Sequence, residues 1–247
     1  MHRLVNDLHL AAVFSTRLPW PVLREYSNEA FSRSLWAFPL VGAGIGLLAG
    51  LVFWGTSLLF PAFPAAFITL GVMLLVTGAL HEDGLADVAD GFGTSGDTER
   101  RLAAMRDSRL GTYGVIAVVL SLGLRGSCIA YLVGGPEALL ALVAASCGSR
   151  SIFSTMLCWL PPARPDGLGA SMKRSSMVMA AVMLVVGAAV VVVCLGPVRG
   201  ILALSMIMVL VVLLGMLALR KIGGQTGDVL GCTQQISEIA ILLAAVS

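Results

Sequence analysis

Long apolar runs decide what this chain can fold into. An α-helix needs about 20 predominantly apolar residues to cross the hydrocarbon core of a bilayer. Six runs of about that length, bounded by Pro, Gly or charged residues, lie at 36–60, 64–80, 111–134, 138–160, 177–196 and 200–219. A seventh run, 233–247, is shorter, and we expect it to span only partly. The sequence therefore predicts an all-α polytopic membrane protein with about six to seven transmembrane helices.

The composition supports this class of protein. Of the 247 residues, 57% are hydrophobic and only 12% are charged, which is too few charges for an ordinary soluble domain. The net charge of +2 lacks the basic excess of a nucleic-acid-binding protein, so we expect no nucleic-acid partner. No internal repeat or low-complexity segment divides the chain, and we predict one integral membrane domain over residues 1–247.

The connections between the apolar runs alternate in kind. Three tight turns would close successive helical hairpins, namely PAFP (61–64), GGPE (134–137) and GPVRG (196–200). The longer polar segments lie near 1–35, 81–110, 161–176 and 220–232. Successive hairpins place these polar segments on one side of the bilayer, and Arg199 is then the only Lys or Arg in a loop on the other side. By the positive-inside rule the polar side faces the cytoplasm, and we expect the amphipathic segment 1–35 to lie at the membrane interface.

Four acidic residues stand close together in ALHEDGLADVADGFG (79–93). Asp83, Asp87 and Asp90 are spaced by four and three residues, so they share one face of a helix and repel one another. A cation is therefore expected opposite them. Carboxylate oxygens and substrate phosphates are the usual ligands of Mg²⁺, and they also suit Mn²⁺. Glu82 lies off this face, and we expect it to tolerate replacement.

Other polar segments carry groups that suit phosphate binding. Guanidinium groups, hydroxyls and glycine backbone all bind phosphate oxygens. The candidates are Gly84 and Gly91 beside the acids, Arg106, Ser108, Arg109 and Gly111 in RDSRLGTYG (106–114), Arg164 in PPARPDGLG (161–169), and Gly223, Gly224, Thr226 and Asp228 in GGQTGDVLG (223–231).

Two arginines lie inside apolar runs, far from either end. An intramembrane arginine is costly, and such residues usually face a protein interior or a wet cavity. Arg125 and Arg150 therefore have either a functional role or an ion-pairing role, and Glu238 is the expected partner of one of them.

The ordered motifs FSTRLP, HEDGLADVADG, RDSRLGTYG, SRSIF, PPARPDGLG and GGQTGD resemble one family. They are similar to those of the adenosylcobinamide-GDP ribazoletransferases, also called cobalamin 5′-phosphate synthases, from about Phe14 to Glu238. The resemblance implies a magnesium-dependent transfer of the adenosylcobinamide phosphate group from adenosylcobinamide-GDP to α-ribazole or its 5′-phosphate, with release of GMP. It also implies the bacterial inner membrane and a late step of cobalamin biosynthesis. A homo-oligomer and contacts with other enzymes of that pathway are left open.

The resemblance also assigns roles to residues. It carries the family's acidic motif onto Asp83, Asp87 and Asp90 and its glycine motif onto Asp228. From phosphoryl-transfer chemistry we expect these four residues to be catalytic and to bind the metal, with Asp107 and Glu82 as further candidate ligands and either Asp87 or Asp90 as the base. The implied substrate-binding and phosphate-binding residues are Arg17, Arg106, Ser108, Arg109, Gly111, Arg150, Arg164, Gly223, Gly224 and Thr226. One departure is Gln235, which stands where relatives often have a Glu.

Two rival functions share some of these features. CDP-alcohol phosphotransferases also use a DG-initiated Asp cluster, but their pattern has Ala-Arg two residues after the DG and two later Asp four residues apart. A secondary transporter would use Arg125, Arg150 and Glu238 to mark a path for its substrate. Here, however, the polar residues concentrate at one end of the predicted bundle.

Overall fold

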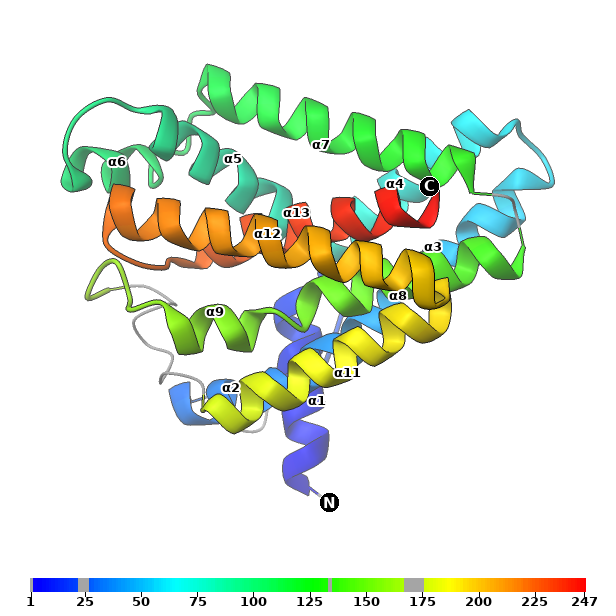
Figure 1. Cartoon of the computed structure of the whole chain (residues 1–247), viewed down its shortest axis with the longest axis horizontal. Coiled ribbons are helices and arrows are strands. Elements are labelled where there is room, and N and C mark those ends of the chain that lie inside the picture. Colours follow the sequence, from blue (N-terminus) through cyan, green and yellow to red (C-terminus); the bar gives the residue numbers. More distant parts are fainter. Residues whose placement is uncertain (1, 22–26, 133–134, 167–175) are drawn as a thin grey trace.

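A computed structural model describes residues 2–21, 27–132, 135–166 and 176–247, and every structural statement below concerns these ranges. Within them the chain is helical, and an isolated bridge between Pro162 and Gln225 is the one β-type pairing (Figure 1). The predicted all-α class is therefore confirmed. Residues 167–175 of the predicted polar segment 161–176 lie outside the described ranges.

Five helical segments are long and apolar enough to cross a membrane, which confirms a multi-pass membrane protein. They are Asn28–Ser57, Thr112–Tyr131, Pro136–Trp159, Met177–Leu195 and Pro197–Ile222. The first comprises α2 (Asn28–Ser34), a 3₁₀ turn (Leu35–Ala37) and α3 (Phe38–Ser57). The others are α7 (Thr112–Tyr131), α8 (Pro136–Arg150) with α9 (Phe153–Trp159), α11 (Met177–Leu195) and α12 (Pro197–Ile222).

The first spanning segment begins earlier than its apolar run predicted. The hydroxyl of Ser27 accepts a hydrogen bond of 3.1 Å from the backbone N–H of Ala30, which caps α2 and starts the helix at Asn28 instead of residue 36. The end of the predicted interfacial segment 1–35 therefore belongs to the first spanning helix. The start of that segment forms a separate helix, α1 (His2–Ser15).

The acidic motif forms a helix, as its spacing predicts, and this helix corrects the start of the predicted polar connection 81–110. Residues 80–93 form α5 (Leu80–Gly93), which follows α4 (Ala62–Thr77) after a bend of 90°. Gly78 and Ala79 make the bend with positive φ angles of 65° and 54°, of which only the glycine accepts such an angle without strain. The exposed connection begins after α5 and includes the short helix α6 (Thr98–Ala104).

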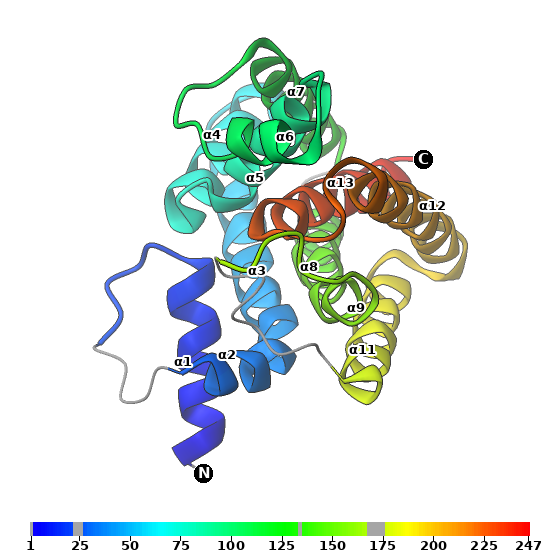
Figure 2. The same ribbon diagram turned by 90° about the vertical axis from the view of Figure 1, so that its left-hand side faces the viewer.

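The last apolar run forms part of a central helix. We predicted a partial span over 233–247, whereas α13 (Gly227–Ala245) begins six residues earlier and is not among the segments apolar enough to qualify as spans. Nearly all of its side chains are buried, because α5, α7, α8 and α12 pack around it (Figure 2). The bundle thus has five apolar spans, or six if α4 and α5 count as one.

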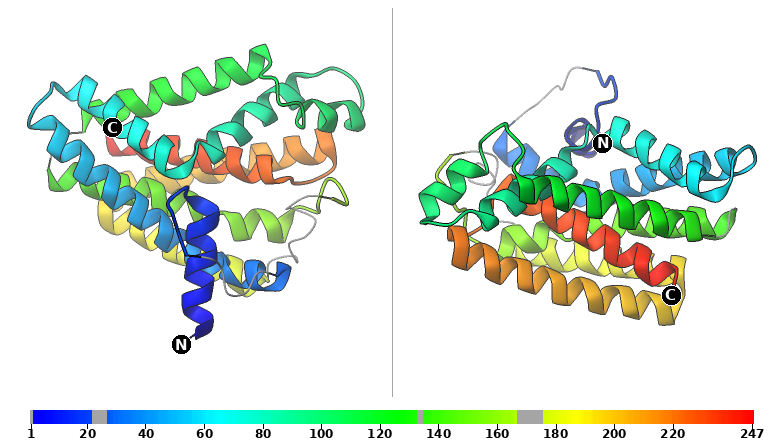
Figure 3. Two further views of the ribbon diagram at one scale, coloured as in Figure 1. Left: turned by 180° about the vertical axis from the view of Figure 1, so that it is seen from behind. Right: turned by 90° about the horizontal axis from the view of Figure 1, so that it is seen from above.

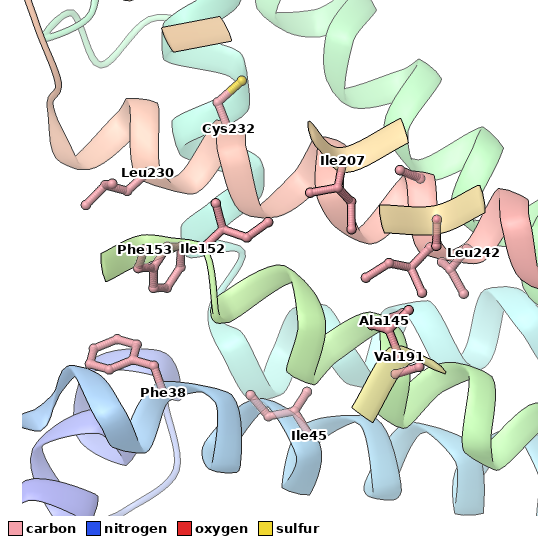
Figure 4. Close-up of a cluster of buried hydrophobic side chains, with 14 of the residues drawn as sticks. Phe38, Ile45, Ala145, Ile152, Phe153, Val191, Ile207, Leu230, Cys232 and Leu242 are labelled. Atoms are coloured by element: carbon pink, nitrogen blue, oxygen red, sulfur yellow. The ribbon is translucent and has the colours of Figure 1, made fainter. Parts of the chain in front are cut away.

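Close helix packing holds the bundle together. Gly42, Gly46 and Gly50 recur every four residues on α3 and face the α8 backbone, so that a Cβ at Gly50 would lie 2.7 Å from the Cα of Leu139. Small residues at this spacing let membrane helices approach closely. A buried apolar core, which includes Ile45, joins α3, α8, α9, α12 and α13 (Figure 4).

The two ends of the bundle differ as the hairpin prediction requires. In Figure 1 the C-terminal ends of α3, α7 and α11 lie together at one end, and the C-terminal ends of α5, α9 and α12 lie at the other. The helix α1 runs across the long helices and packs on α2 and α3 (Figure 3), where its buried Asp7 accepts hydrogen bonds from Arg33 Nε at 2.9 Å and Trp36 Nε1 at 3.1 Å. The exposed Leu4, Val5 and Leu8 of α1 are the side chains expected of an interfacial helix.

Candidate functional site

Two glycines bring the acidic helix against the central helix. A Cβ at Gly84 of α5 would lie 2.9 Å from the carbonyl oxygen of Asp228, and a Cβ at Gly231 of α13 would lie 3.4 Å from the Cα of Gly84. The two backbones can therefore cross in direct contact, which places Asp83 and Asp228 along the same cleft. We expected Gly84 to leave room for phosphate, but it instead allows α5 to pack against α13.

The carboxylates of Asp83, Asp87 and Asp228 gather with the guanidinium of Arg164 at this crossing. Asp87 lies within electrostatic reach of Asp83, Asp228 and Asp90, and Arg164 is the cation that acts on it. Arg164 Nη2 lies 3.4 Å from Asp228 Oδ2, while Arg164 Nη1 is buried without a hydrogen-bond partner among the described residues. A buried guanidinium nitrogen without a partner is costly, and an anionic ligand would satisfy it.

Two loops that are far apart in the sequence hold Arg164 in place. The N–H of Gln225 donates to the carbonyl of Pro161 at 2.8 Å, and the N–H of Ala163 donates to the carbonyl of Gln225 at 2.9 Å. Gly224 is pressed against Pro161, so a side chain at residue 224 would collide with the Pro161 carbonyl. The glycine-rich loop after α12 therefore positions the arginine loop after α9.

The same glycine-rich loop prepares the first turn of α13. Gly223 ends α12 in the left-handed conformation, with φ 80°. Thr226 is the N-cap of α13, and its hydroxyl accepts a hydrogen bond from Val229 N at 3.3 Å and donates one to Asp228 Oδ2 at 3.0 Å. Thr226 thus orients the Asp228 carboxylate.

Asp90 is occupied by the start of α7. Its two carboxylate oxygens accept hydrogen bonds from the N–H groups of Gly111 at 2.7 Å and Gly114 at 2.9 Å. A Cβ at either glycine would collide with the carboxylate, so these glycines of the basic motif exist to seat Asp90 at a helix N-terminus. Gly91, expected to face phosphate, is instead packed against Met105.

The arginines of the basic motif form exposed ion pairs. Arg106 Nη2 donates to both carboxylate oxygens of Asp166 at 2.7 Å, which links this connection to the Arg164 loop. Arg109 donates to Asp107 at 2.7 Å and 3.0 Å and lowers the pKa of that carboxyl to about 2, so Asp107 is already paired. Ser108 lies exposed between them.

Arg17 lies at the bend that precedes α5. Its N–H donates to the carbonyl of Val76 at 2.7 Å, and its side chain covers Gly78 at the bend between α4 and α5. The structure therefore does not bring Arg17 into the group formed by the three carboxylates and Arg164.

Glu82 belongs to a separate buried charge cluster, and this placement argues against our expectation that it tolerates replacement. Arg125 Nη1 lies 2.6 Å from Glu82 Oε1, and Arg125 Nη2 lies 2.8 Å from Glu238 Oε1. Gln235 hydrogen-bonds to both members of the first pair. Its amide nitrogen donates to Glu82 at 3.1 Å, and its amide oxygen accepts from Arg125 at 3.2 Å. Glu82 therefore neutralises Arg125 within this cluster.

Arg150 also belongs to this cluster, which corrects its expected role in phosphate binding. Its side chain is buried in α8, where Nη1 donates to the carbonyl of Ser146 at 2.9 Å and lies 4.0 Å from Glu238 Oε2. Glu238 is thus a partner of both intramembrane arginines. The ion-pairing alternative holds for Arg125 and Arg150, and the cluster of two arginines and two glutamates is internally neutral.

The carboxylates fit a metal site only if substrate completes it. Among the described residues no three His, Cys, Asp or Glu side chains converge closely enough to enclose a metal ion by themselves. Magnesium, however, is commonly held by one or two carboxylates together with substrate phosphates and water. Asp83, Asp87 and Asp228 offer that donor chemistry. Both oxygens of Asp90, in contrast, accept backbone N–H groups, and Asp107 and Glu82 are each paired with an arginine at 2.7 Å or less.

An aromatic cleft adjoins the acids, and sequence reasoning missed it. It has a volume of about 210 Å³, carries Asp83 and Asp228 on its lining, and is walled by Phe14, Phe31, Phe38, Phe153 and Leu157, among others. The four phenylalanines belong to α1, α2, α3 and α9. Since they share no spacing or motif in the chain, only the fold could reveal them.

Comparison with known proteins agrees with this arrangement of motifs. The family model described as cobalamin-5-phosphate synthase matches residues 7–246. A protein of Bradyrhizobium diazoefficiens is 43% identical over 99% of this chain and 95% of its own length. Proteins of Mesorhizobium japonicum and Xanthobacter autotrophicus are 42% and 44% identical, each over 98% of this chain and over 93% and 96% of their own lengths. All three relatives are named adenosylcobinamide-GDP ribazoletransferase. No solved structure matches the chain.

Proposed function

The chain belongs to the cobalamin-5-phosphate synthase family, and from that premise we propose that it joins a corrinoid to a riboside. The proposed donor is adenosylcobinamide-GDP, the acceptor is α-ribazole or its 5′-phosphate, and GMP is released. The observation that carries the proposal is the group formed by Asp83, Asp87, Asp228 and Arg164, in which Arg164 Nη1 has no partner among the described residues. A pyrophosphate needs this combination of guanidinium and metal-binding carboxylates.

The reaction exchanges one phosphorus–oxygen bond for another. A ribose hydroxyl oxygen of the acceptor bonds to the phosphorus that carries the corrinoid, and the bond from that phosphorus to the bridging oxygen of GMP breaks. The hydroxyl proton passes to a base, and the GMP phosphate takes the electron pair of the broken bond. Positioning and charge neutralisation supply most of the catalysis in transfers of this kind.

The chain's own groups divide these tasks. Arg164 would bind a phosphate oxygen through Nη1 and exchange its contact with Asp228 for one with the substrate. Asp87 is the better candidate for the base, because both oxygens of Asp90 already accept backbone N–H groups. Asp83 and Asp228 would hold magnesium, which when bound neutralises charge on the pyrophosphate and the leaving group. Manganese could replace it with the same ligands.

We also propose that the site faces the cytoplasm of a bacterium from its inner membrane. The C-terminal ends of α5, α9 and α12 lie together at the end of the bundle opposite the C-terminal ends of α3, α7 and α11 (Figure 1), and Arg164 and Asp228 follow shortly after α9 and α12 in the chain. Because the positive-inside rule favours Lys and Arg on the cytoplasmic side, the basic connections at that end support this orientation. Nucleotide substrates would then reach the site from the compartment in which they are made.

The experiment uses protein purified in detergent or reconstituted in nanodiscs. It is given adenosylcobinamide-GDP and α-ribazole, or separately α-ribazole 5′-phosphate, and GMP and the corrinoid product are quantified. The wild type should release GMP only in the presence of acceptor and magnesium, and Asp228→Asn and Asp83→Asn should lose activity while remaining monodisperse. Glu137→Gln, an exposed residue at the opposite end of the bundle, is the matched control. Near wild-type activity of Asp228→Asn at saturating magnesium would show the carboxylate assignment to be wrong.

A parallel reaction with CDP-diacylglycerol and a small alcohol tests the rival phosphotransferase function. Release of CMP in that reaction, without release of GMP in the first, would replace the proposed function.

A further inference from the structure

The aromatic cleft is lined by phenylalanine rings and by two carboxylates, those of Asp83 and Asp228. Phe14 and Phe31 pack edge to face with ring centroids 5.0 Å apart, and Phe38 and Phe153 do so at 5.7 Å (Figure 4 shows the second pair). Phe38 also lies 5.7 Å from Phe31, so the rings form a continuous wall. At the polar end stand the carboxylates of Asp83 and Asp228.

The apolar lining and the size of the cleft exclude both the guanine and the corrin ring of the donor. Among the described residues that line the cleft, the charged or polar side chains are those of His81, Asp83 and Asp228, and the imidazole of His81 is stacked on Phe153 at 6.0 Å. Guanine carries a carbonyl, a ring N–H and an amino group along one edge, and these would lose their hydrogen bonds against phenyl rings. A corrin macrocycle is far too large for a cleft of about 210 Å³.

A flat bicyclic base without exocyclic polar groups matches the cleft in both size and chemistry. Aromatic side chains favour such rings through stacking and edge-to-face contacts. A ribose attached to that base would extend toward the acidic end, where one of its hydroxyls meets the carboxylates. The cleft thus explains how an acceptor nucleoside can be oriented with its base in the apolar part and its sugar at Asp83 and Asp228.

We propose that this aromatic cleft is the binding site for the benzimidazole-type base of the acceptor nucleoside, and that Phe31 and Leu157 determine the preference for an apolar base. This proposal rests on the proposed function, because it places the acceptor at the group formed by Asp83, Asp87, Asp228 and Arg164. The nucleotide part of the donor then occupies the outer side of that group, near the exposed ion pair by which Arg106 and Asp166 join two connections.

The test compares acceptor and donor kinetics in three variants. Phe31→Leu removes one ring of the wall, and Leu157→Gln places an amide within it. Phe53→Leu is the matched control, since Phe53 is also a buried phenylalanine of the bundle but does not line the cleft. Each variant is first checked by size-exclusion chromatography, and KM is then measured for a benzimidazole riboside, for an adenine riboside and for the corrinoid-GDP donor.

Phe31→Leu should raise KM for the benzimidazole riboside by about tenfold and leave the donor KM unchanged. Leu157→Gln should narrow the preference for the benzimidazole riboside over the adenine riboside, because the amide can pair with the purine edge. Phe53→Leu should change neither KM. Equal acceptor KM values in Phe31→Leu, Leu157→Gln and the wild type would overturn the subsite.

A second measurement separates this proposal from the proposed function. Calorimetric titration of the riboside into Asp87→Asn measures acceptor binding without turnover. Binding that Phe31→Leu weakens in that background supports the cleft even if the wild type releases no GMP, whereas GMP release with unaffected riboside binding refutes the cleft alone.

Discussion

The buried charge cluster formed by Glu82, Arg125, Glu238 and Arg150 makes a prediction about stability. Arg125 contacts Glu82 at 2.6 Å and Glu238 at 2.8 Å, and all four side chains are almost completely shielded from solvent. Removing one partner of a buried ion pair leaves an unpaired charge and typically costs about 3–5 kcal/mol. Glu82→Ala should therefore lower the free energy of unfolding by about that amount, which is a large share of a typical total.

The double variant Glu82→Met with Arg125→Met sharpens this prediction. It removes one charge of each sign and leaves Glu238 with Arg150, so the remaining cluster is still neutral. Apolar residues that replace a complete buried pair are often neutral or stabilising. We therefore expect the double variant to be more stable than either single Met variant, in contrast to the additive loss expected of independent sites.

The assay is denaturation in mixed micelles followed by tryptophan fluorescence. Asp107→Asn, which breaks an exposed pair with Arg109, is the control and should not change the transition. A loss below about 1 kcal/mol for Glu82→Ala, or a double variant that loses the sum of both single losses, would refute the reasoning.

Three further predictions concern the helices and the site. Gly46→Leu should destabilise the bundle by about 1–3 kcal/mol because its side chain would enter the α8 backbone, while Gly44→Leu on the same helix, where nothing lies within 4 Å, should have little effect in the same denaturation assay. Gly111→Ala should lower kcat by about a hundredfold, because displacing the Asp90 carboxylate shifts α5 and with it Asp83 and Asp87, and Gly123→Ala, a site with free space within α7, should leave kcat unchanged. Because the pKa of Asp107 is lowered to about 2, any stabilising effect of its pair is complete above its unfolded pKa near 3.9 and is lost only as the pH falls toward 2. The pH–activity profile between pH 5 and 9 should consequently be the same in Asp107→Asn and the wild type, and a shifted acidic limb in the variant would contradict this.

The apolar runs predicted the spanning helices well, because a bilayer imposes length and composition on each helix separately. α5 was misplaced because its charges resemble a loop, whereas its burial depends on partners in α7 and α13. Helical periodicity did place Asp83, Asp87 and Asp90 on one face and Glu82 off it. What Glu82 meets instead is Arg125, 43 residues away, and no local pattern could reveal that pairing.

The contact partners of the glycines in the site motifs could not be predicted from the sequence either. Gly84, Gly91 and Gly111 were expected to approach phosphate, since a bare backbone suits an anion. In the fold they permit close contacts with α13, Met105 and Asp90. A glycine in the sequence signals a close approach, but the partner in that approach is set by tertiary structure.

The central position of α13 has a consequence for how the protein is made. This helix carries Gln234, Gln235 and Glu238 in the middle of the bundle, and it is too polar to qualify as a span by itself. During synthesis it follows every helix that later surrounds it. We expect α13 to insert poorly into the membrane by itself. It would be retained in the bundle because Arg125 and Glu82, which are synthesised earlier, pair with its Glu238 and Gln235. Assembly of the active site would then be the event that completes biogenesis, so that no catalytically competent intermediate exists before the whole bundle has closed.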